Sequence, residues 1–167
     1  MQTHNRVTVD LAAYPDLTVI LLGLEITSPR ALLSLGRIGR GLAELANKAP
    51  DGLLHHQKLS RGWRQPGFIQ YWRDFESLER FTRTNPHAAW WRHFMAKHRG
   101  CGFWHETYSA RRGFEAIYVD MPSPLGFSAF APNITPTGPF ASSRKRLGRN
   151  GKVSQTDADA ALMPEAT

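Results

Sequence analysis

Cysteine is almost absent from the sequence, and no apolar run is long. The single cysteine, Cys101, excludes an internal disulfide bond and a cysteine-rich metal site, and it fits a reducing compartment. The longest apolar run, Leu17 to Leu24, is far shorter than the roughly 20 residues that a membrane-spanning helix needs. Acidic Asp10 and Asp16 precede this run, where a secretory signal would carry basic residues. We therefore expect a cytoplasmic protein without a membrane partner.

The common catalytic signatures are missing as well. The sequence holds no GxGxxG motif after a strand, no P-loop and no GxSxG elbow, so no motif indicates a nicotinamide, nucleotide or serine-hydrolase mechanism. His105 and Glu106 belong to HETY, which is not the HExxH zinc signature. His93 and His98 are five residues apart, the wrong phase on a helix for shared metal chelation. We expect neither a metal site nor a cofactor from these patterns.

The net charge of +7 raises the question of a nucleic-acid partner. The basic residues are scattered over several segments, and only Arg144-Lys145-Arg146 forms a run. No recognised nucleic-acid motif orders them, and arginines on solvated helix faces explain the scatter. A weak, salt-sensitive contact between that run and an anion is compatible with the pattern. We do not expect nucleic acid as a partner.

Apolar periodicity divides the first half of the chain into a helix and three strands. At 167 residues, the chain is long enough for one domain with a sizeable core. Leu17 to Thr27 is short and rich in Val, Ile and Leu, as in a buried central strand. Pro29 to Asn47 carries leucines every three or four residues and is predicted as an amphipathic helix capped by Ser28. Leu53 to Arg61 and Phe68 to Phe75 are predicted as the next two strands.

The second half of the chain predicts two further helices and a hairpin. Asp74 or Ser77 can cap the first of these helices, and the second runs from Pro86 to about His98. Phe103 to Ser109 and Phe114 to Asp120 have the pattern of two paired strands. The order β-α-β-β-α-β-β predicts an α+β fold, a ferredoxin-like arrangement with one added strand.

Both ends of the chain lack this periodicity. Residues 1–16 are predicted as an N-terminal extension, and residues 17–127 as the folded domain. Prolines accumulate after Met121, so residues 128–140 are predicted as an irregular segment. Residues 141–167 offer little apolar surface to offset the entropy of ordering, and we expect them to be disordered.

The helix that begins at Pro86 carries a stripe of aromatic and histidine side chains. At about 100° per residue, the stripe covers roughly one third of the helix circumference and should face inward. Its members are His87, Trp90, Trp91, Phe94 and His98. His93 points nearly the other way. The two histidines are either inert, hydrogen-bonded core residues or side chains that face a cavity.

Strand alternation separates the side chains between Phe103 and Tyr108. Phe103, His105 and Thr107 fall on one face, and Trp104, Glu106 and Tyr108 fall on the other. His105 and Glu106 therefore cannot pair with each other without a bulge. Glu106 could instead form an interior ion pair with Arg73 of the preceding strand. The alternative is that these two charged residues act as acid, base or substrate anchor.

A resemblance to a known family covers about Leu17 to Phe127. The segments FIQYWRDFESLERF, HAAW, GFWHETY and FEAIYVDMP resemble the family named for a fumagillin-pathway monooxygenase, which stands near the antibiotic-biosynthesis monooxygenases of the dimeric α+β barrel type. The resemblance implies a ferredoxin-like protomer whose sheet packs face to face with that of a second copy. It thus implies a homodimer, a place in secondary metabolism and a ligand cavity between sheet and helices.

Cofactor-independent monooxygenases of related families imply one mechanism. They hold an electron-rich substrate in an apolar cavity and let its anion reduce O₂, which requires a base and a group that holds an oxyanion. On this sequence His87 or His105 would be the base and Arg73 the anion holder. The candidate catalytic residues are His87, His105, Arg73 and Glu106. The candidate substrate-binding residues are Trp72, Trp90, Trp91, Phe94, Trp104 and Tyr108.

Haem-dependent relatives, such as aldoxime dehydratases and chlorite dismutases, imply another mechanism. They need an axial histidine in the same cavity, for which His98 and His87 are the candidates. The short chain, without the extra domain repeat typical of those haem enzymes, favours the cofactor-independent mechanism. A third alternative is a non-catalytic barrel that binds an apolar or aromatic small molecule. The sequence leaves open the substrate, the use of O₂ and whether the domain is catalytic.

Overall fold

The computed structural model describes residues 7–29, 31, 49–85, 87–97 and 100–147. The helix predicted over residues 29–47 falls almost wholly outside these ranges. Within them, no helix has both the length and the hydropathy to cross a bilayer.

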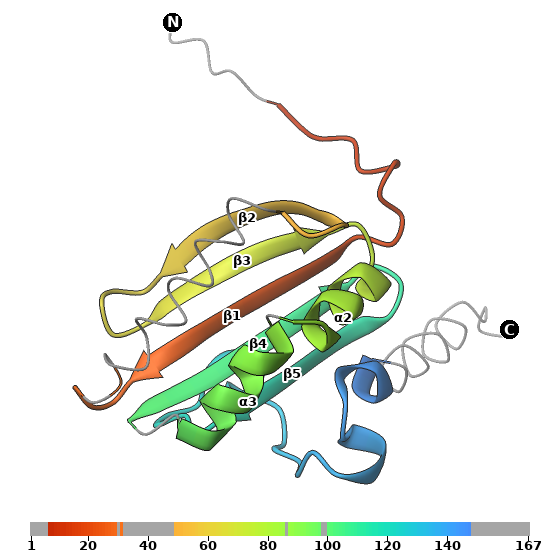
Figure 1. Cartoon of the computed structure of the whole chain (residues 1–167). Coiled ribbons are helices and arrows are strands. Elements are labelled where there is room, and N and C mark those ends of the chain that lie inside the picture. Colours follow the sequence, from red (N-terminus) through yellow and green to blue (C-terminus); the bar gives the residue numbers. More distant parts are fainter. Residues whose placement is uncertain (1–6, 30, 32–48, 86, 98–99, 148–167) are drawn as a thin grey trace, which may run out of the picture.

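Five strands form one antiparallel sheet. They are β1 (Thr18–Ile26), β2 (Leu53–Ser60), β3 (Pro66–Trp72), β4 (Cys101–Ser109) and β5 (Gly113–Val119), in the order β2-β3-β1-β4-β5 (Figure 1). The apolar strand β1 lies in the middle, where it pairs with β3 on one side and β4 on the other. A hairpin adds β5 beyond β4. This is the predicted ferredoxin-like order with one added strand, so the α+β prediction is confirmed.

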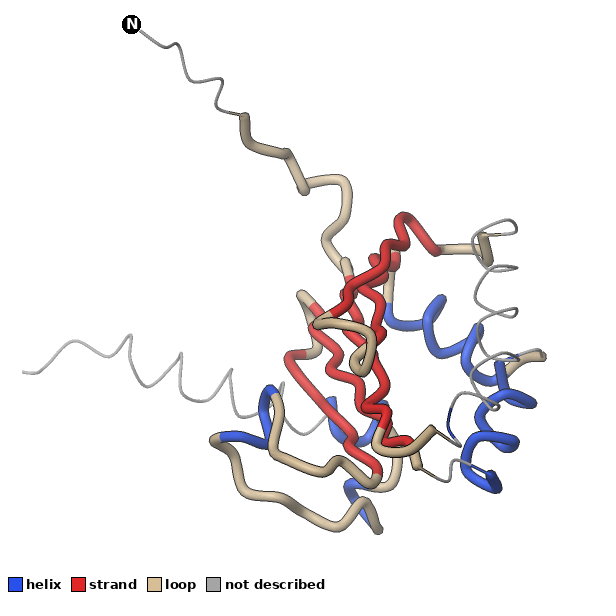
Figure 2. Tube along the Cα trace, turned by 90° about the vertical axis from the view of Figure 1, so that its left-hand side faces the viewer, coloured by secondary structure: helices blue, strands red, loops and turns tan. Residues whose placement is uncertain are grey.

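Two consecutive helices, α2 (Phe75–Arg83) and α3 (His87–Lys97), cover one face of the sheet (Figure 2). Asp74 caps α2, because its carboxylate accepts a hydrogen bond of 2.6 Å from the amide of Ser77. Of the two predicted caps, Asp74 is therefore the correct one. Phe75, Leu78 and Phe81 recur every three residues on α2 and are buried, as expected for the core-facing side of an amphipathic helix.

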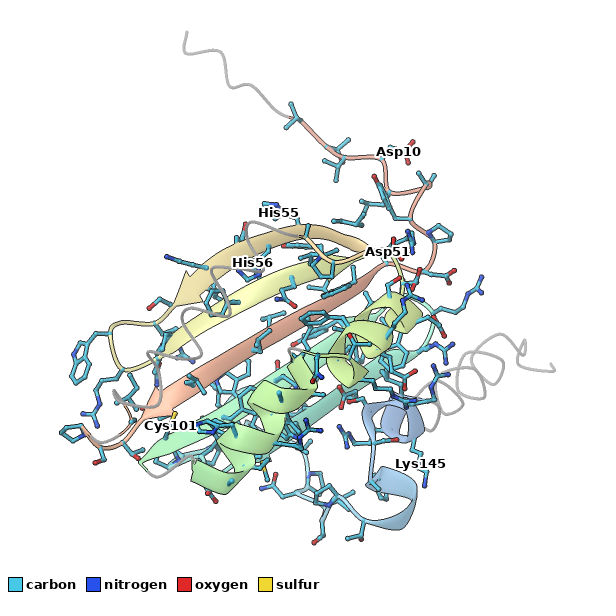
Figure 3. The ribbon with its side chains drawn as sticks, in the orientation of Figure 1. Asp10, Asp51, His55, His56, Cys101 and Lys145 are labelled. Carbon is cyan, nitrogen blue, oxygen red and sulfur yellow. The ribbon has the colours of Figure 1, made fainter. Side chains whose placement is uncertain are left out.

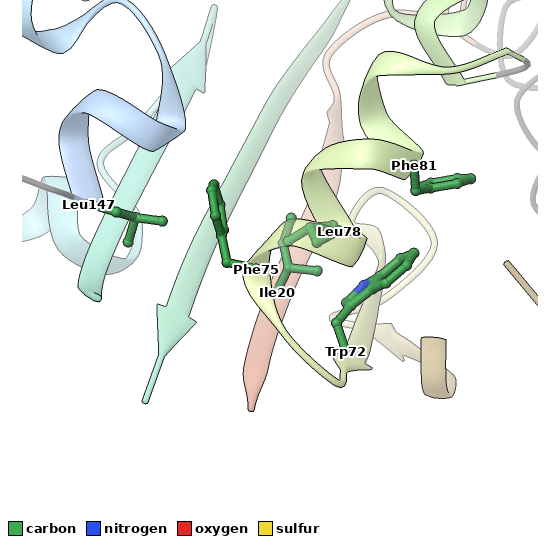
Figure 4. Packing of buried hydrophobic residues seen from close by; sticks show 6 residues of the cluster. All are labelled: Ile20, Trp72, Phe75, Leu78, Phe81 and Leu147. Atoms are coloured by element: carbon green, nitrogen blue, oxygen red, sulfur yellow. The ribbon is translucent and has the colours of Figure 1, made fainter. Parts of the chain in front are cut away.

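The hydrophobic core lies between this sheet face and the helices, in two clusters. The first cluster consists of Ile20, Trp72, Phe75, Leu78, Phe81 and Leu147 (Figure 4). The second consists of Ile26, Ala31, Phe94 and Cys101, with Trp91 and Phe103 packed against it. Burial raises the pKa of the Cys101 thiol to about 11, so the one cysteine is a core residue and not a reactive thiolate.

After β5 the chain passes round the β5 edge of the sheet, from one face to the other. The 3-10 helix η1 (Gly126–Ala129) is bound to the face away from α2 and α3, where the amide of Phe127 donates to Glu106. The 3-10 helix η2 (Gly138–Phe140) and a helical turn over residues 143–147 follow. In that turn Arg146 binds Glu115, which lies on the helix-covered face.

The prediction of disorder from Ala141 onward is wrong for residues 141–147. Leu147 is completely buried in the first core cluster, and Arg146 is buried beside Glu115. The prediction from average composition failed because an average over the tail conceals two individual residues. One leucine packs into an apolar cluster, and one arginine binds a buried carboxylate. Residues 148–167 lie outside the described ranges.

Candidate functional site

A cavity of about 660 Å³ lies between the sheet and the helices, a volume in the range of small-molecule sites. Its wall is mainly apolar. The apolar wall includes Ile20, Leu22, Leu24 and Ile26 of β1, Phe68 of β3, Phe103 of β4, and Trp91 and Phe94 of α3. The four β1 residues share the wall because every second residue of a strand points to the same face. The cavity therefore suits an apolar or aromatic molecule.

His87, the first residue of α3, is partly buried on the cavity wall. Its Nδ1 lies 3.1 Å from the carbonyl oxygen of Thr82. A carbonyl oxygen only accepts, so Nδ1 carries the proton and the lone pair of the neutral ring is on Nε2. Burial lowers the pKa of His87, the Thr82 hydrogen bond opposes this shift, and the charge of His105 adds to it. The ring is thus neutral near pH 7, with Nε2 as its basic atom.

His105, on β4, lines the same cavity and is held by a carboxylate. Its Nε2 lies 3.0 Å from Oε1 of Glu115, on the neighbouring strand β5. The hydroxyl of Thr107 donates to the same oxygen at 2.6 Å. The guanidinium of Arg146 holds the other oxygen, Oε2, with Nε at 2.8 Å and Nη2 at 2.7 Å. Both oxygens of Glu115 are therefore fixed in place.

The Glu115 carboxylate is ionised although its side chain is fully buried. Burial alone would raise its pKa, but the hydrogen bond and charge of His105, the Thr107 hydroxyl and the charge of Arg146 lower it to about 2. Because an ionised carboxylate only accepts, Nε2 of His105 carries a proton. In the neutral ring, Nδ1 is then the atom that can accept a proton or a hydrogen bond. An imidazole oriented in this way is suited to proton transfer.

Four of the predicted site residues meet on this cavity. They are His87, Trp91, Phe94 and His105. The inward stripe of α3 and the alternation along β4 are thus confirmed for these positions. Their catalytic and binding roles remain predictions. The side chain of Trp90 and the whole of His98 lie outside the described part of the chain, so the predictions for both also stay open.

Arg73 does not reach the cavity, which corrects its prediction as the anion holder. Its side chain is 51% exposed and lies 3.3 Å from Asp51 and 3.0 Å from Asp74. Asp51 is in the turn before β2 (Figure 3). Arg73 follows the last residue of β3, where the chain has already left the sheet, so the strand pattern does not direct its side chain. The predicted ion pair with Glu106 is wrong for the same reason.

Glu106, Trp104 and Tyr108 point away from the cavity, on the opposite face of the sheet, as their alternation with His105 requires. Glu106 is buried and accepts hydrogen bonds from the Tyr108 hydroxyl at 2.6 Å, the Phe127 amide at 2.7 Å and the Tyr118 hydroxyl. The bond from Phe127 fastens η1 to the sheet, and the two tyrosine hydroxyls hold the carboxylate in place. The predicted placement of these three residues in the same site as His105 is therefore wrong.

Trp72 supports the cavity from behind instead of lining it. Its side chain is completely buried in the first core cluster. The indole Nε1 donates to Gln70 at 3.2 Å, and the ring lies 5.4 Å from that of Phe81. Gln70 and Phe81 are both wall residues, so Trp72 fixes their positions.

Sequence reasoning missed Glu115 and Arg146. The signal for Glu115 was available, because alternation places it on the same face of its strand as Ile117. Hairpin pairing then sets Glu115 opposite Thr107 and Ile117 opposite His105. A carboxylate buried on this face needs a polar partner, and the inward-facing histidine beside it can supply one. Arg146 had no such signal, because its position depends on how the chain turns round the sheet edge.

The elements described above define an α+β domain of the ferredoxin-like type with a mainly apolar cavity between sheet and helices. Residues 17–127 match the model of the family described as Monooxygenase af470-like. The chain therefore belongs to this monooxygenase-like family.

Individual proteins that resemble this chain share only a low sequence identity with it. An aliphatic aldoxime dehydratase of Rhodococcus erythropolis is 29% identical over 117 residues, which is 65% of this chain and 32% of that protein. This chain thus spans about a third of the length of that relative. The crystal structure of aldoxime dehydratase OxdRE with butyraldoxime is 22% identical with a TM-score of 0.43, over 67% of this chain and 33% of that one. SnoaB, a cofactor-independent oxygenase from Streptomyces nogalater, is 13% identical with a TM-score of 0.39, over 66% of this chain and 97% of that one.

Proposed function

We propose that this protein is a small-molecule monooxygenase that oxidises an apolar or aromatic substrate without a bound cofactor. One observation carries the proposal, namely that His105 and its buried carboxylate partner Glu115 lie on the wall of an otherwise mainly apolar cavity. Membership of a monooxygenase-like family supports the class of reaction. The apolar wall supports the class of substrate.

In this proposal His105 is the base. Glu115 holds the Nε2–H, so Nδ1 takes a proton from an activated methylene group of the substrate, and Glu115 stabilises the imidazolium that forms. The substrate carbanion then gives electrons to O₂. Two C–H bonds of the methylene group break and a C=O bond forms. One oxygen atom enters the product and the other leaves as water, so O₂ accepts the four electrons that the carbon loses.

His87 has a different part in this proposal. It is neutral near pH 7, and its Nε2 is the atom able to accept a hydrogen bond from a substrate hydroxyl. A phenol or enol next to the activated carbon would be held there while His105 removes the proton. The apolar wall keeps water away from the resulting carbanion.

Oxygen consumption with a panel of aromatic ketones that carry an activated methylene group tests the proposal. The wild-type protein, treated with a chelator, should consume O₂ with at least one of them. His105→Gln keeps the shape of the ring edge but not its basicity, so turnover should fall on the order of 10²- to 10⁴-fold. His93→Gln is the matched control, because His93 is on α3 but not on the cavity wall, and should keep full turnover. Full turnover in His105→Gln would refute the role of His105.

A haem enzyme is the second candidate function, and the hydrogen bond of His87 favours it. An imidazole that donates its Nδ1–H to a backbone carbonyl is the usual arrangement of a metal-binding histidine. The volume and apolar wall of the cavity also fit a large flat aromatic group. His87 would hold the iron, which would supply a Lewis-acidic and redox-active centre. The aldoxime dehydratase relative supports this alternative.

Absorbance near the Soret region separates the two candidates. On titration with hemin, a haem protein should reach saturation at one equivalent with a sharp Soret band. His87→Gln should shift or abolish that band, whereas His93→Gln should not. A protein that binds no hemin and still consumes O₂ would leave the cofactor-independent proposal alone.

A further inference from the structure

The segment Gly138–Leu147, here called the C-terminal strap, contributes to the cavity although it lies beyond the family-matched residues 17–127. Its wall residues are Ala141, Ser142, Ser143 and Arg146. Leu147 anchors the strap in the core, and the Arg144 side chain binds Glu79 of α2 with Nε 3.0 Å from both carboxylate oxygens. The strap is thus attached on both sides of Arg146.

The Arg146 guanidinium is fixed by four contacts to three groups. Besides its two contacts with Oε2 of Glu115, Nη1 donates to the carbonyl oxygen of Phe140 at 2.8 Å and Nη2 to the hydroxyl of Ser143 at 3.2 Å. Its side chain is only 11% exposed. A planar guanidinium held at all three nitrogens has little freedom to move, so it fixes the plane of the carboxylate it binds.

We propose that Arg146 is a positioning residue for His105 and acts through Glu115, an inference that rests on the proposed function. By holding Oε2, Arg146 keeps Oε1 directed at the imidazole and at Thr107. Its positive charge also offsets part of the carboxylate's charge, which weakens the hold of Glu115 on an extra proton of His105. The strap thereby holds Glu115, and through it the His105 ring, in the orientation that the proposed base requires.

The other charged groups around His105 do not take over this task. His87 faces it from α3, but is neutral near pH 7. Glu79 of α2 lines the same cavity, but already binds Arg83 at 2.7 Å and Arg144. Among the described residues, Arg146 is the guanidinium that contacts Glu115. Removing it leaves a buried carboxylate whose nearest cation would be a protonated His105.

NMR titration of the histidine rings in the full-length protein tests this inference. The His105 signal is identified by its loss in His105→Gln. Arg146→Met should move the titration midpoint of His105 to higher pH by about one unit, as expected for a buried carboxylate left without its second cation. The acidic limb of the pH–rate profile should move in the same direction. Adding Glu115→Gln to Arg146→Met should reverse the shift, because the carboxylate itself is then gone.

Lys145→Met is the matched control. It removes one positive charge from the same strap, but Lys145 is exposed and points away from the sheet (Figure 3). Within the described part of the chain, its ammonium group donates to the carbonyl oxygen of Gly138. It should leave the His105 titration unchanged. If Arg146→Met does not fold, Arg146→Lys is used instead. Lysine keeps the positive charge but cannot hold Oε2 of Glu115 with two nitrogen atoms, so a smaller shift in the same direction is expected.

An unchanged His105 midpoint in a folded Arg146 variant would overturn the inference. The titration needs no substrate, so its result is independent of whether the protein is an oxygenase. If the midpoint shifts but His105→Gln keeps full turnover, the positioning by Arg146 stands and the proposed function fails. If His105→Gln is inactive but the midpoint does not shift, the proposed function stands and the positioning by Arg146 fails.

Discussion

His105 and Glu115 are joined by a hydrogen bond of 3.0 Å across the β4–β5 hairpin, although they are not opposite each other in the strand register. Glu115 pairs with Thr107, and His105 pairs with Ile117. The contact is therefore diagonal, which is within the reach of long side chains on one sheet face. Because the hairpin sets both residues on the helix-covered face, the geometry of the pair depends on this local pairing.

Acid should destabilise the protein through Glu115. The pKa of this carboxyl is about 2 in the folded protein and about 4.5 when it is unperturbed. A depressed pKa stabilises the fold above the unperturbed value, and that stabilisation is lost as the pH falls from about 4.5 to about 2. It amounts to on the order of 3 kcal/mol. Urea unfolding at a series of pH values should show this loss.

Glu115→Gln is the variant that isolates the effect. It should be less stable than wild type at pH 7, because Arg146 is left buried without its carboxylate. Between pH 4.5 and pH 2, its stability should fall much less than that of wild type. The same steep acid loss in both proteins would show that other carboxyl groups cause it.

Leu147→Ala should destabilise the protein by about 2–4 kcal/mol, because the side chain is completely buried in the first core cluster. Ile134→Ala is the control, since Ile134 is 61% exposed in the same C-terminal region and should change the stability by less than about 0.5 kcal/mol. Thermal unfolding measures both. Equal melting temperatures for wild type and Leu147→Ala would mean that the strap does not dock in solution.

Much of this fold was accessible from the sequence, because its strands and helices carry regular apolar periods. The inward placement of His87, Phe94 and His105 followed from 3.6-residue and two-residue spacing. Two-residue spacing also placed Glu106 and His105 on opposite faces of their strand, but the site inferred from the family resemblance still included both. Arg73 failed because it lies just past the end of a strand, where alternation no longer applies.

The C-terminal strap was the larger failure, and its cause is physical. Disorder was inferred from average composition, whereas docking depends on two side chains, Leu147 and Arg146, that fit places created by distant parts of the chain. Such long-range complementarity leaves no periodic trace in the sequence. The partner carboxylate, Glu115, was nonetheless recognisable from hairpin pairing.

Homodimer formation stays a prediction. The sheet face away from α2 and α3 carries Leu21, Ile69 and Tyr71, which keep part of their surface exposed in the single chain. A second copy packed on this face would cover them. Light scattering at micromolar protein should give twice the chain mass of 18.8 kDa, and Ile69→Arg should halve it. A monomeric wild-type protein would contradict the face-to-face assembly.

We propose that the cavity with His105 and Glu115 is the site of a cofactor-independent monooxygenase. Mass spectrometry of the product formed under ¹⁸O₂ tests it most directly, using chelator-treated protein and the best ketone from the substrate panel. We expect one ¹⁸O atom in the new carbonyl group, the other in water, and no labelled product from His105→Gln beyond the uncatalysed background. A product without ¹⁸O, or one formed only after hemin is added, would contradict the claim.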